Sequence, residues 1–283
     1  MVAFHYEEFE PPAPLRPFLR ATFFAEGQIH YPTDRILPNG LAVAIFNLSA
    51  PHLVGKRPDR SDWESFERDW VHGVQTTPMF NTPTGRTRVV GMLFDPVGLH
   101  ALTGKDITHW TDLTVAAADI LPPGFIEGMK SLLDSPGETA THQALHDLFA
   151  AHARLDQPGW VLDLAGDLRA KNGMVSLDAA YKGIGHSARH LNAVFKRMNG
   201  VSPKTLSCIY RLNALLGEIG ATGAVNWAKL AHDYGFYDQS HFNREFRRFA
   251  GMTPRAYLEG RRTAYPEAGP GEGVSFAPEG EVS

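Results

Sequence analysis

The feature of this sequence that most restricts its fold is a repeat within the last third of the chain. A shift of 51 positions places Phe195–Leu206 on Phe246–Tyr257. The two stretches share a phenylalanine, a pair of basic residues, a glycine and a Ser/Thr-Pro step, and upstream of them Leu191 falls on Phe242. A repeat of this length indicates two copies of one supersecondary unit that pack as neighbours.

Each copy predicts a helix, a turn and a second helix. In the second copy the first helix ends at Asp233, and Gly235 provides a turn that tolerates positive φ. Asp238 is a favourable N-cap for a helix over Gln239–Phe249. The sequence therefore predicts two helix-turn-helix units.

The helix over Gln239–Phe249 has one apolar face and one polar face. Phe242, Phe246 and Phe249 follow the spacing i, i+4, i+7, which predicts one buried stripe. The polar face carries Gln, Asn and Arg, and these side chains pair with base edges in the major groove, which predicts a DNA-reading helix. The alternative interpretation is an ordinary surface helix with a solvated basic face, and the presence of a second copy favours the DNA-reading helix. The residues outside the stripe are Gln239, Ser240, Asn243, Arg244, Arg247 and Arg248.

Helical periodicity also predicts the remainder of the C-terminal region. A helix over Lys204–Ile219, about 24 Å long at 1.5 Å per residue, is apolar nearly all round and is expected to join the two units. Trp160–Asn172 is expected to open the region. The other predicted helices are Leu177–Lys182 and Ser187–Met198 in the first unit and Val225–Asp233 in the second.

These motifs resemble the AraC-type DNA-binding domain of bacterial transcription regulators over roughly residues 160–262. The second unit carries the resemblance through Gly235-Phe236, Asp238-Gln239-Ser240-His241-Phe242, Arg244, Phe246-Arg247, Gly251, Thr253-Pro254 and Tyr257. The first unit carries it through Gly185, Ser187, Arg189, Leu191, Phe195, Gly200, Ser202 and Pro203.

The resemblance implies which side chains face DNA. The residues expected at base edges are Arg189, Asn192 and Ala193 in the first unit and Gln239, Ser240, Asn243 and Arg244 in the second. Ala193 departs from the family pattern, which usually has arginine there, although an alanine can still contact a thymine methyl group. The residues expected at phosphates, some of which could instead be only solvated, are Ser187, Lys196, Arg197, Lys204, Arg247, Arg248 and Arg255.

The first 110 residues predict mainly β structure. Strong strand patterns cover Thr22–Ala25, Leu41–Leu48 and Arg88–Phe94, a shorter one covers Trp70–Val74, and residues 76–85 are expected to form a loop. Short strands without a βαβ rhythm favour a barrel or double-sheet roll. From Pro96 the pattern becomes helical, through Val97–Leu102, Asp112–Leu121, Phe125–Leu133 and Thr139–Leu155.

The expected fold class is α+β, with a mainly-β barrel or roll that carries accessory helices, followed by an all-α domain. We expect a regulatory domain over 1–120, a helical segment over 121–157, the DNA-binding domain over 158–262 and a disordered tail over 263–283. The N-terminal part resembles an uncharacterised domain type found ahead of AraC-type domains. That resemblance is carried by Arg35-Ile36-Leu37-Pro38-Asn39-Gly40, Gly73-Val74-Gln75-Thr76, Pro83-Thr84-Gly85 and Phe94-Asp95-Pro96-Val97-Gly98-Leu99.

The charge distribution fits this division. Residues 1–159 carry 12 Lys and Arg against 19 Asp and Glu, whereas residues 160–262 carry 15 against 8. A basic region in an acidic chain is typical of nucleic-acid contact. The single cysteine, Cys208, excludes an internal disulfide, and no apolar run is long enough to span a membrane. We therefore expect a cytoplasmic bacterial protein at the nucleoid.

Other functional classes are not favoured by the residue patterns. Of the 13 histidines, those in the first 110 residues show no H-x-H spacing followed by Glu, so we expect no metal. No cofactor motif or catalytic constellation emerges either. The candidates for an aromatic-lined interior that could hold an effector are Phe23, Phe24, Phe46, Phe94 and Trp70.

We expect a transcription regulator that binds double-stranded DNA, with RNA polymerase, a small-molecule effector and a second copy of the chain as candidate partners. The alternatives are an N-terminal enzyme, or a pure oligomerisation module, attached to a DNA-binding domain.

Overall fold

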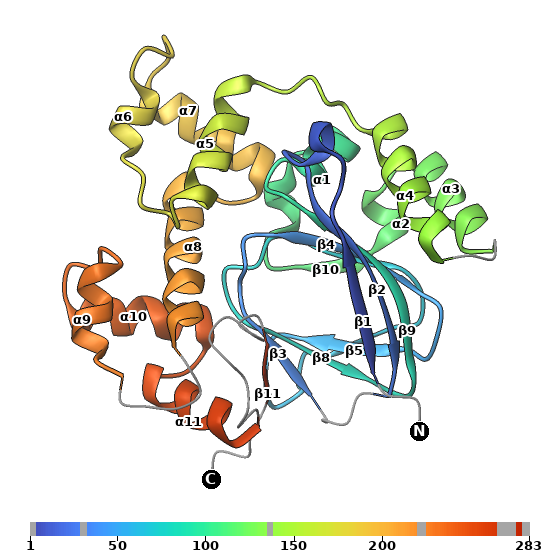
Figure 1. Ribbon diagram of the computed structural model, residues 1–283, viewed down its shortest axis with the longest axis horizontal. Coiled ribbons are helices and arrows are strands. Elements are labelled where there is room, and N and C mark those ends of the chain that lie inside the picture. The colour runs from blue at the N-terminus through green and yellow to red at the C-terminus, as the bar shows by residue number, and fades with distance from the viewer. Residues whose placement is uncertain (1–3, 29–32, 135–137, 220–224, 265–275, 279–283) are drawn as a thin grey trace.

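The computed structural model describes residues 4–28, 33–134, 138–219, 225–264 and 276–278. Strands dominate the N-terminal half and helices the C-terminal half (Figure 1). The expected α+β class is confirmed. Within the described residues, the β structure consists of two antiparallel sheets that do not close into a barrel.

The larger sheet has six strands in the order β1-β2-β9-β4-β7-β10, and every neighbouring pair is antiparallel. Its centre is formed by the segments with the strongest strand patterns, β2, β9 and β4. The strands are β1 (His5–Phe9), β2 (Leu19–Gly27), β9 (Thr87–Phe94), β4 (Ala42–Asn47), β7 (Trp70–His72) and β10 (Thr114–Ala116).

The smaller sheet has five strands in the order β11-β3-β8-β5-β6. Its strands are β11 (Phe276–Pro278), β3 (Asp34–Ile36), β8 (Met79–Pro83), β5 (His52–Gly55) and β6 (Glu64–Phe66). Three expectations are corrected by the two sheets. Residues 76–85 were expected to form a loop but contain β8. Asp112–Leu121 was expected to be helical but contains β10 ahead of the helix over Ala117–Ile120. Of the tail over 263–283 that was expected to be disordered, residues 276–278 form β11, and residues 265–275 and 279–283 lie outside the described residues.

The two faces of the larger sheet have different partners. One face packs on helices of the N-terminal half and contributes Phe24, Phe46 and Phe94 to the main core. The opposite face carries Phe23 and Trp70 toward the smaller sheet, where the Trp70 ring lies 5.2 Å from His52 and 5.8 Å from Phe66. The five aromatic residues therefore do not line one interior, because alternate residues of a strand point to opposite faces.

Most helices of the N-terminal half follow β9 in the chain. The main core receives Phe125 and Met129 from α3, and Leu145 and Phe149 from α4. The elements are η1 (Ala13–Leu15), α1 (Gly98–Thr103), η2 (Ile107–Trp110), α2 (Ala117–Ile120), α3 (Pro123–Leu133) and α4 (Glu138–His152).

The C-terminal half consists of helices close to those predicted by the sequence. The helix α5 (Gly159–Ala170) opens it, α6 and α7 form the first helix-turn-helix unit, and α9 and α10 form the second. The long helix α8 joins the two units and α11 follows the second (Figure 1). Their bounds are α6 (Leu177–Tyr181), α7 (Ala188–Asn199), α8 (Pro203–Glu218), α9 (Trp227–Asp233), α10 (Gln239–Ala250) and α11 (Pro254–Ala264). The boundary expected at residues 157–158 falls between α4 and α5.

The two halves share their apolar cores. The main core runs from the larger sheet through α5, α7 and the first turns of α8, where it includes Phe195 and Leu206. The second unit has a core of its own, but Leu37 of the N-terminal half is buried in it, with 1% of its surface exposed. A buried Asp95 carboxylate at the end of the larger sheet also forms an ion pair with Arg169 of α5. The first helix-turn-helix unit is therefore packed against the N-terminal half, through η2 and α1, and is not attached to it by a linker alone.

Candidate nucleic-acid interface

The helices α7 and α10 begin and end in the same way. The Ser187 Oγ accepts a hydrogen bond from the His190 amide at 3.3 Å, and the Asp238 carboxylate accepts one from the His241 amide at 2.7 Å. Both helices end at a glycine in the left-handed region, with φ of +78° at Gly200 and +71° at Gly251. A residue with a Cβ would be strained there, so the repeated glycines fix both helix ends.

The inner face of α10 is anchored by aromatic rings. Phe242, Phe246 and Phe249 are each at most 1% exposed. The Phe246 ring lies 5.6 Å from Phe242, 6.2 Å from Trp227 and 5.7 Å from Tyr257. In α7, Leu191, Phe195 and Met198 occupy the corresponding inner face. Both helices are therefore packed into the protein through their apolar faces, and the opposite face of each is open to solvent.

The second unit presents the polar face that the sequence predicts. Gln239, Ser240 and Arg244 are exposed on α10, and Asn243 is half-buried beside them. His241 is also half-buried, with its ring 5.8 Å from Phe236. The residues named for base contact on α10 thus lie on the side opposite the phenylalanine stripe.

The first unit is less open at one position. Arg189 and Ala193 are exposed on α7, whereas Asn192 is half-buried and its Oδ1 accepts a hydrogen bond from the Tyr181 hydroxyl at 2.9 Å. Reading adenine requires a donor and an acceptor from the same amide. One lone pair of the Asn192 oxygen is therefore already used within the protein, and this bond fixes the orientation of the half-buried amide. Sequence reasoning missed this contact, and no spacing signal pointed to it.

The basic residues named for phosphate contact are all exposed, and some have acidic neighbours. Arg255 pairs with Glu259 at 2.8 Å, and Arg248 lies 3.8 Å from Glu245. Ser187 is exposed, although its hydroxyl already caps α7. The remaining members of this set are Lys196, Arg197, Lys204 and Arg247.

The helix α8 separates the two units. It has 16 residues and buries Leu206, Ile209, Leu212 and Leu215, as the apolar pattern predicts. One unit lies at each end of α8, with α6 and α9 on the side away from the sheets (Figure 1). The helices α7 and α10 therefore belong to different ends of α8.

Histidines form buried pairs rather than a metal centre in the described part of the chain, where no group of three or more His, Cys, Asp or Glu could hold a metal ion. The Thr22 hydroxyl lies 2.9 Å from His142 Nδ1 and 3.2 Å from His146 Nε2. Between the sheets, Trp70 Nε1 donates to His72 Nε2 at 2.8 Å. Burial lowers the pKa of His142 to about 4 and that of His72 to about 3. These histidines are therefore neutral near pH 7.

The helices α7 and α10 each have a buried apolar face and an exposed polar face, and each follows a shorter helix and a turn. This repeated arrangement defines a DNA-binding protein of the tandem helix-turn-helix class. Residues 182–260 match the family model of a helix-turn-helix domain, and residues 7–116 match a domain of unknown function (DUF6597). The chain is a DNA-binding transcription regulator whose helix-turn-helix domain is of the AraC type. The resemblance seen in the sequence is thus confirmed for both parts of the chain.

Comparison with solved structures found similar architectures at low sequence identity. ToxT from Vibrio cholerae aligns with a TM-score of 0.41 at 10% identity, over 91% of this chain and 98% of that chain. ToxT bound to (E)-4-(8-methylnaphthalen-1-yl)but-3-enoic acid aligns with a TM-score of 0.42 at 8% identity, over 91% and 99%. The AraC-like transcriptional activator CuxR aligns with a TM-score of 0.27 at 14% identity, over 74% and 84%. Among curated proteins, none matches the sequence. No helix in the described ranges is long and apolar enough to cross a membrane.

Proposed function

We propose that this regulator reads a specific DNA sequence by placing α7 and α10 in successive major-groove segments on one face of the duplex, about 34 Å apart. The observation that carries the proposal is the matched design of the two helices, with equivalent caps, a buried inner stripe and an exposed polar face. One chain would then bind a site made of two short DNA segments, here called boxes, one contacted by α7 and one by α10. Such a site does not need to be palindromic.

The two helices are proposed to contribute unequally to base recognition. On α10, the exposed Arg244 suits guanine, and the amides of Gln239 and Asn243 suit adenine. On α7, Arg189 is the main candidate for hydrogen bonds to bases, because Ala193 offers only a methyl group and Asn192 is engaged by Tyr181. The second box should therefore be the more strictly read of the two.

The N-terminal half is proposed to be regulatory and not enzymatic, so that it either responds to a small molecule or holds two copies of the chain together. The contact it makes with both helix-turn-helix units supports this role, since a change in its packing would reach them directly. A ligand can shift such a protein only if it binds two states unequally. RNA polymerase remains a proposed partner. If DNA affinity and Tm stay unchanged across a metabolite panel, the oligomerisation role is favoured over sensing.

Selection from a randomised duplex library tests the proposal for DNA. Two conserved boxes on one face of the duplex are the expected result. A selection that enriches no sequence over the starting library would contradict sequence-specific reading.

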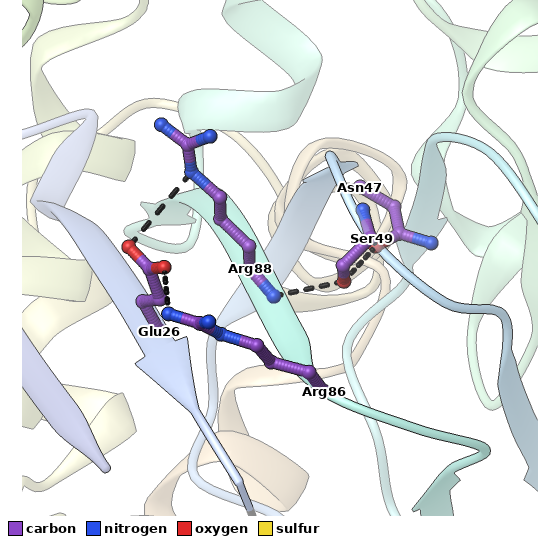
Figure 2. A network of polar contacts seen from close by, with 5 residues as sticks. All are labelled: Glu26, Asn47, Ser49, Arg86 and Arg88. Carbon is purple, nitrogen blue, oxygen red and sulfur yellow. Dashed lines mark hydrogen bonds and ion pairs between the residues drawn. The ribbon is translucent and has the colours of Figure 1, made fainter. Parts of the chain in front are cut away.

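Replacing Arg244 by alanine should weaken binding to the selected duplex by about 1–3 kcal/mol and relax discrimination at one base position, because one bidentate contact is lost. Competition titrations with the four duplexes that differ at that position measure the effect. The matched control is Arg86→Ala, which removes an exposed arginine that pairs with Glu26 on the larger sheet (Figure 2). An equal loss on selected and random duplexes would remove Arg244 from the base-reading set.

Replacing Arg247 by alanine should have a different signature. A phosphate contact carries no base information, so binding should weaken on all duplexes and the slope of log Kobs against log salt should decrease by about 1. Titrations of a random-sequence duplex at several NaCl concentrations measure this slope. An unaltered slope would show that Arg247 is only solvated.

A further inference from the structure

The N-terminal half holds the C-terminal end of α7. The Thr111 hydroxyl donates a hydrogen bond to the carbonyl of Gly200, the residue that ends α7, at 2.7 Å. A Cβ added to Gly200 would lie 3.1 Å from Thr111 Oγ1 and 3.3 Å from Ile107 Cγ2. The helix α7 also packs against η2 and α1. The first reading helix is thus fixed at its last turn by the segment 107–111.

A different segment of the N-terminal half holds the equivalent end of α10. Arg35 Nη1 donates to the carbonyl of Ala250, the last residue of α10, at 3.2 Å, and its guanidinium lies 5.0 Å from the centre of the Phe80 ring. A Cβ added to Gly251 would lie 3.3 Å from Pro78 Cγ. A cation is well placed there, because the C-terminal end of a helix carries partial negative charge.

The two contacts are joined by one carboxylate. Asp112, next to Thr111, accepts hydrogen bonds from the Thr76 amide and hydroxyl, both at 2.6 Å, and from the Thr77 amide at 3.2 Å. Pro78 follows Thr77 directly and lies beside Gly251, the residue that ends α10. A short path therefore connects the end of α7 to the end of α10 without passing through α8.

We propose that residues 35, 76–80 and 107–112, here called the brace, fix the distance and orientation between α7 and α10. Arg35, Thr111 and Asp112 are then positioning residues that set which separation between two DNA boxes the protein accepts. This inference rests on the proposed function for its consequence on DNA, but the geometry it describes belongs to the free protein.

The brace acts in parallel with α8. The first turns of α8 belong to the core that contains α7, through Leu206, and its later turns belong to the core of the second unit, through Leu212 and Leu215. The brace adds a contact at the C-terminal end of each helix, at Gly200, three residues before α8 begins at Pro203, and at Ala250. A direct tie between these two helix ends opposes bending of α8 and rotation of one unit relative to the other. Leu37 and the hydrogen bond from Asn213 Nδ2 to the Pro38 carbonyl, at 2.9 Å, keep the Arg35 strand against the second unit.

The first experiment uses the DNA-free protein. Spin labels at His190→Cys and Tyr237→Cys, both exposed positions outside the brace, report the separation of the two units in a Cys208→Ser background by pulsed electron resonance. Thr111→Val and Asp112→Ala should each broaden the distance distribution, whereas Thr111→Ser, which keeps the hydroxyl, should restore the narrow one. Arg88→Met is the control, since the Arg88 side chain pairs with Glu26 on the larger sheet, and its backbone amide, which the substitution keeps, donates to Ser49 Oγ (Figure 2). Unchanged distributions in both brace variants would overturn the proposal.

The second experiment reads the same property on DNA. Selection from the randomised library should give wild-type protein two boxes at one spacing. Thr111→Val should select the same boxes, with preference over a spacing longer by one base pair reduced about fivefold, as expected for one lost hydrogen bond. Retained spacing preference in Thr111→Val overturns the brace. If wild-type protein selects no boxes, the proposed function fails, while the distance measurements still decide whether the brace exists.

Discussion

Phe246→Ala is expected to unfold the second helix-turn-helix unit and to abolish selective DNA binding. Phe246 is 1% exposed and its ring touches three aromatic neighbours, Trp227, Phe242 and Tyr257. Removing a buried phenylalanine costs about 3–5 kcal/mol, because apolar contacts are lost and a cavity remains. The loss falls on the core of the second unit, to which Phe246 and two of its three ring neighbours belong as buried residues.

Hydrogen exchange of the backbone amides measures this outcome. Amides of α9 and α10 should lose protection in Phe246→Ala, while those of the larger sheet keep it, because the second unit has a separate apolar core. Tyr237→Ala is the matched control, since Tyr237 is 92% exposed and surface substitutions usually change stability by about 0.5 kcal/mol or less. Equal loss of protection across the whole chain would contradict a separate second core.

Arg169→Met is expected to weaken the junction between the two halves by about 2 kcal/mol. It leaves Asp95, whose side chain is 3% exposed, without its ion-pair partner. A fully buried broken pair costs about 3–5 kcal/mol, and the smaller value applies here because Arg169 is 39% exposed and water screens its charge. Urea unfolding of wild-type and variant protein measures the difference.

The pH dependence of that difference has a defined sign. Burial raises the pKa of Asp95, and the nearby Arg169 guanidinium acts against this rise. Removing Arg169 therefore raises the pKa of Asp95 further. Between the unfolded and the folded pKa, the Asp95 carboxyl is then protonated in the folded protein and ionised in the unfolded chain. The unfolding free energy of Arg169→Met should accordingly decrease as pH rises from 3.8, the unfolded-state pKa, to the raised pKa of the folded state. The loss of stability relative to wild-type protein is therefore largest near pH 7 and becomes smaller at acidic pH.

A double substitution separates this charge effect from lost packing. Asp95→Asn combined with Arg169→Met should recover most of the stability at pH 7, because no unpaired charge remains. A double variant no more stable than Arg169→Met would show that packing of the arginine stem is what matters.

The helical half could be predicted closely because its signals are local. The cap residues Ser187 and Asp238, the terminal glycines Gly200 and Gly251 and the phenylalanine stripe each act within one helix. The prediction for α8 differs from the structure by one residue at each end. The polar face of α10 followed from the same periodicity, although its contacts with DNA remain predictions.

The sheets were predicted less well because their pairing is decided by distant segments. β8 is rich in Thr, Asn and Pro and forms because β3 and β5 flank it, so tertiary context outweighs its weak intrinsic preference. β10 lies next to a helix in the sequence and is recruited by β7. The Tyr181–Asn192 hydrogen bond and the Arg35–Ala250 contact depend on side-chain placement in three dimensions, for which the sequence contains no periodic signal.

The division of the apolar cores implies an order of folding during synthesis. The larger sheet leaves the ribosome first, and α5 and α7 can pack on it as soon as they emerge, since all three belong to one core. Leu37 has to wait, because the core that buries it is completed only by α10 and α11, some two hundred residues later in the nascent chain. Until then this leucine faces water, and the second reading unit is the last part of the regulator to become competent.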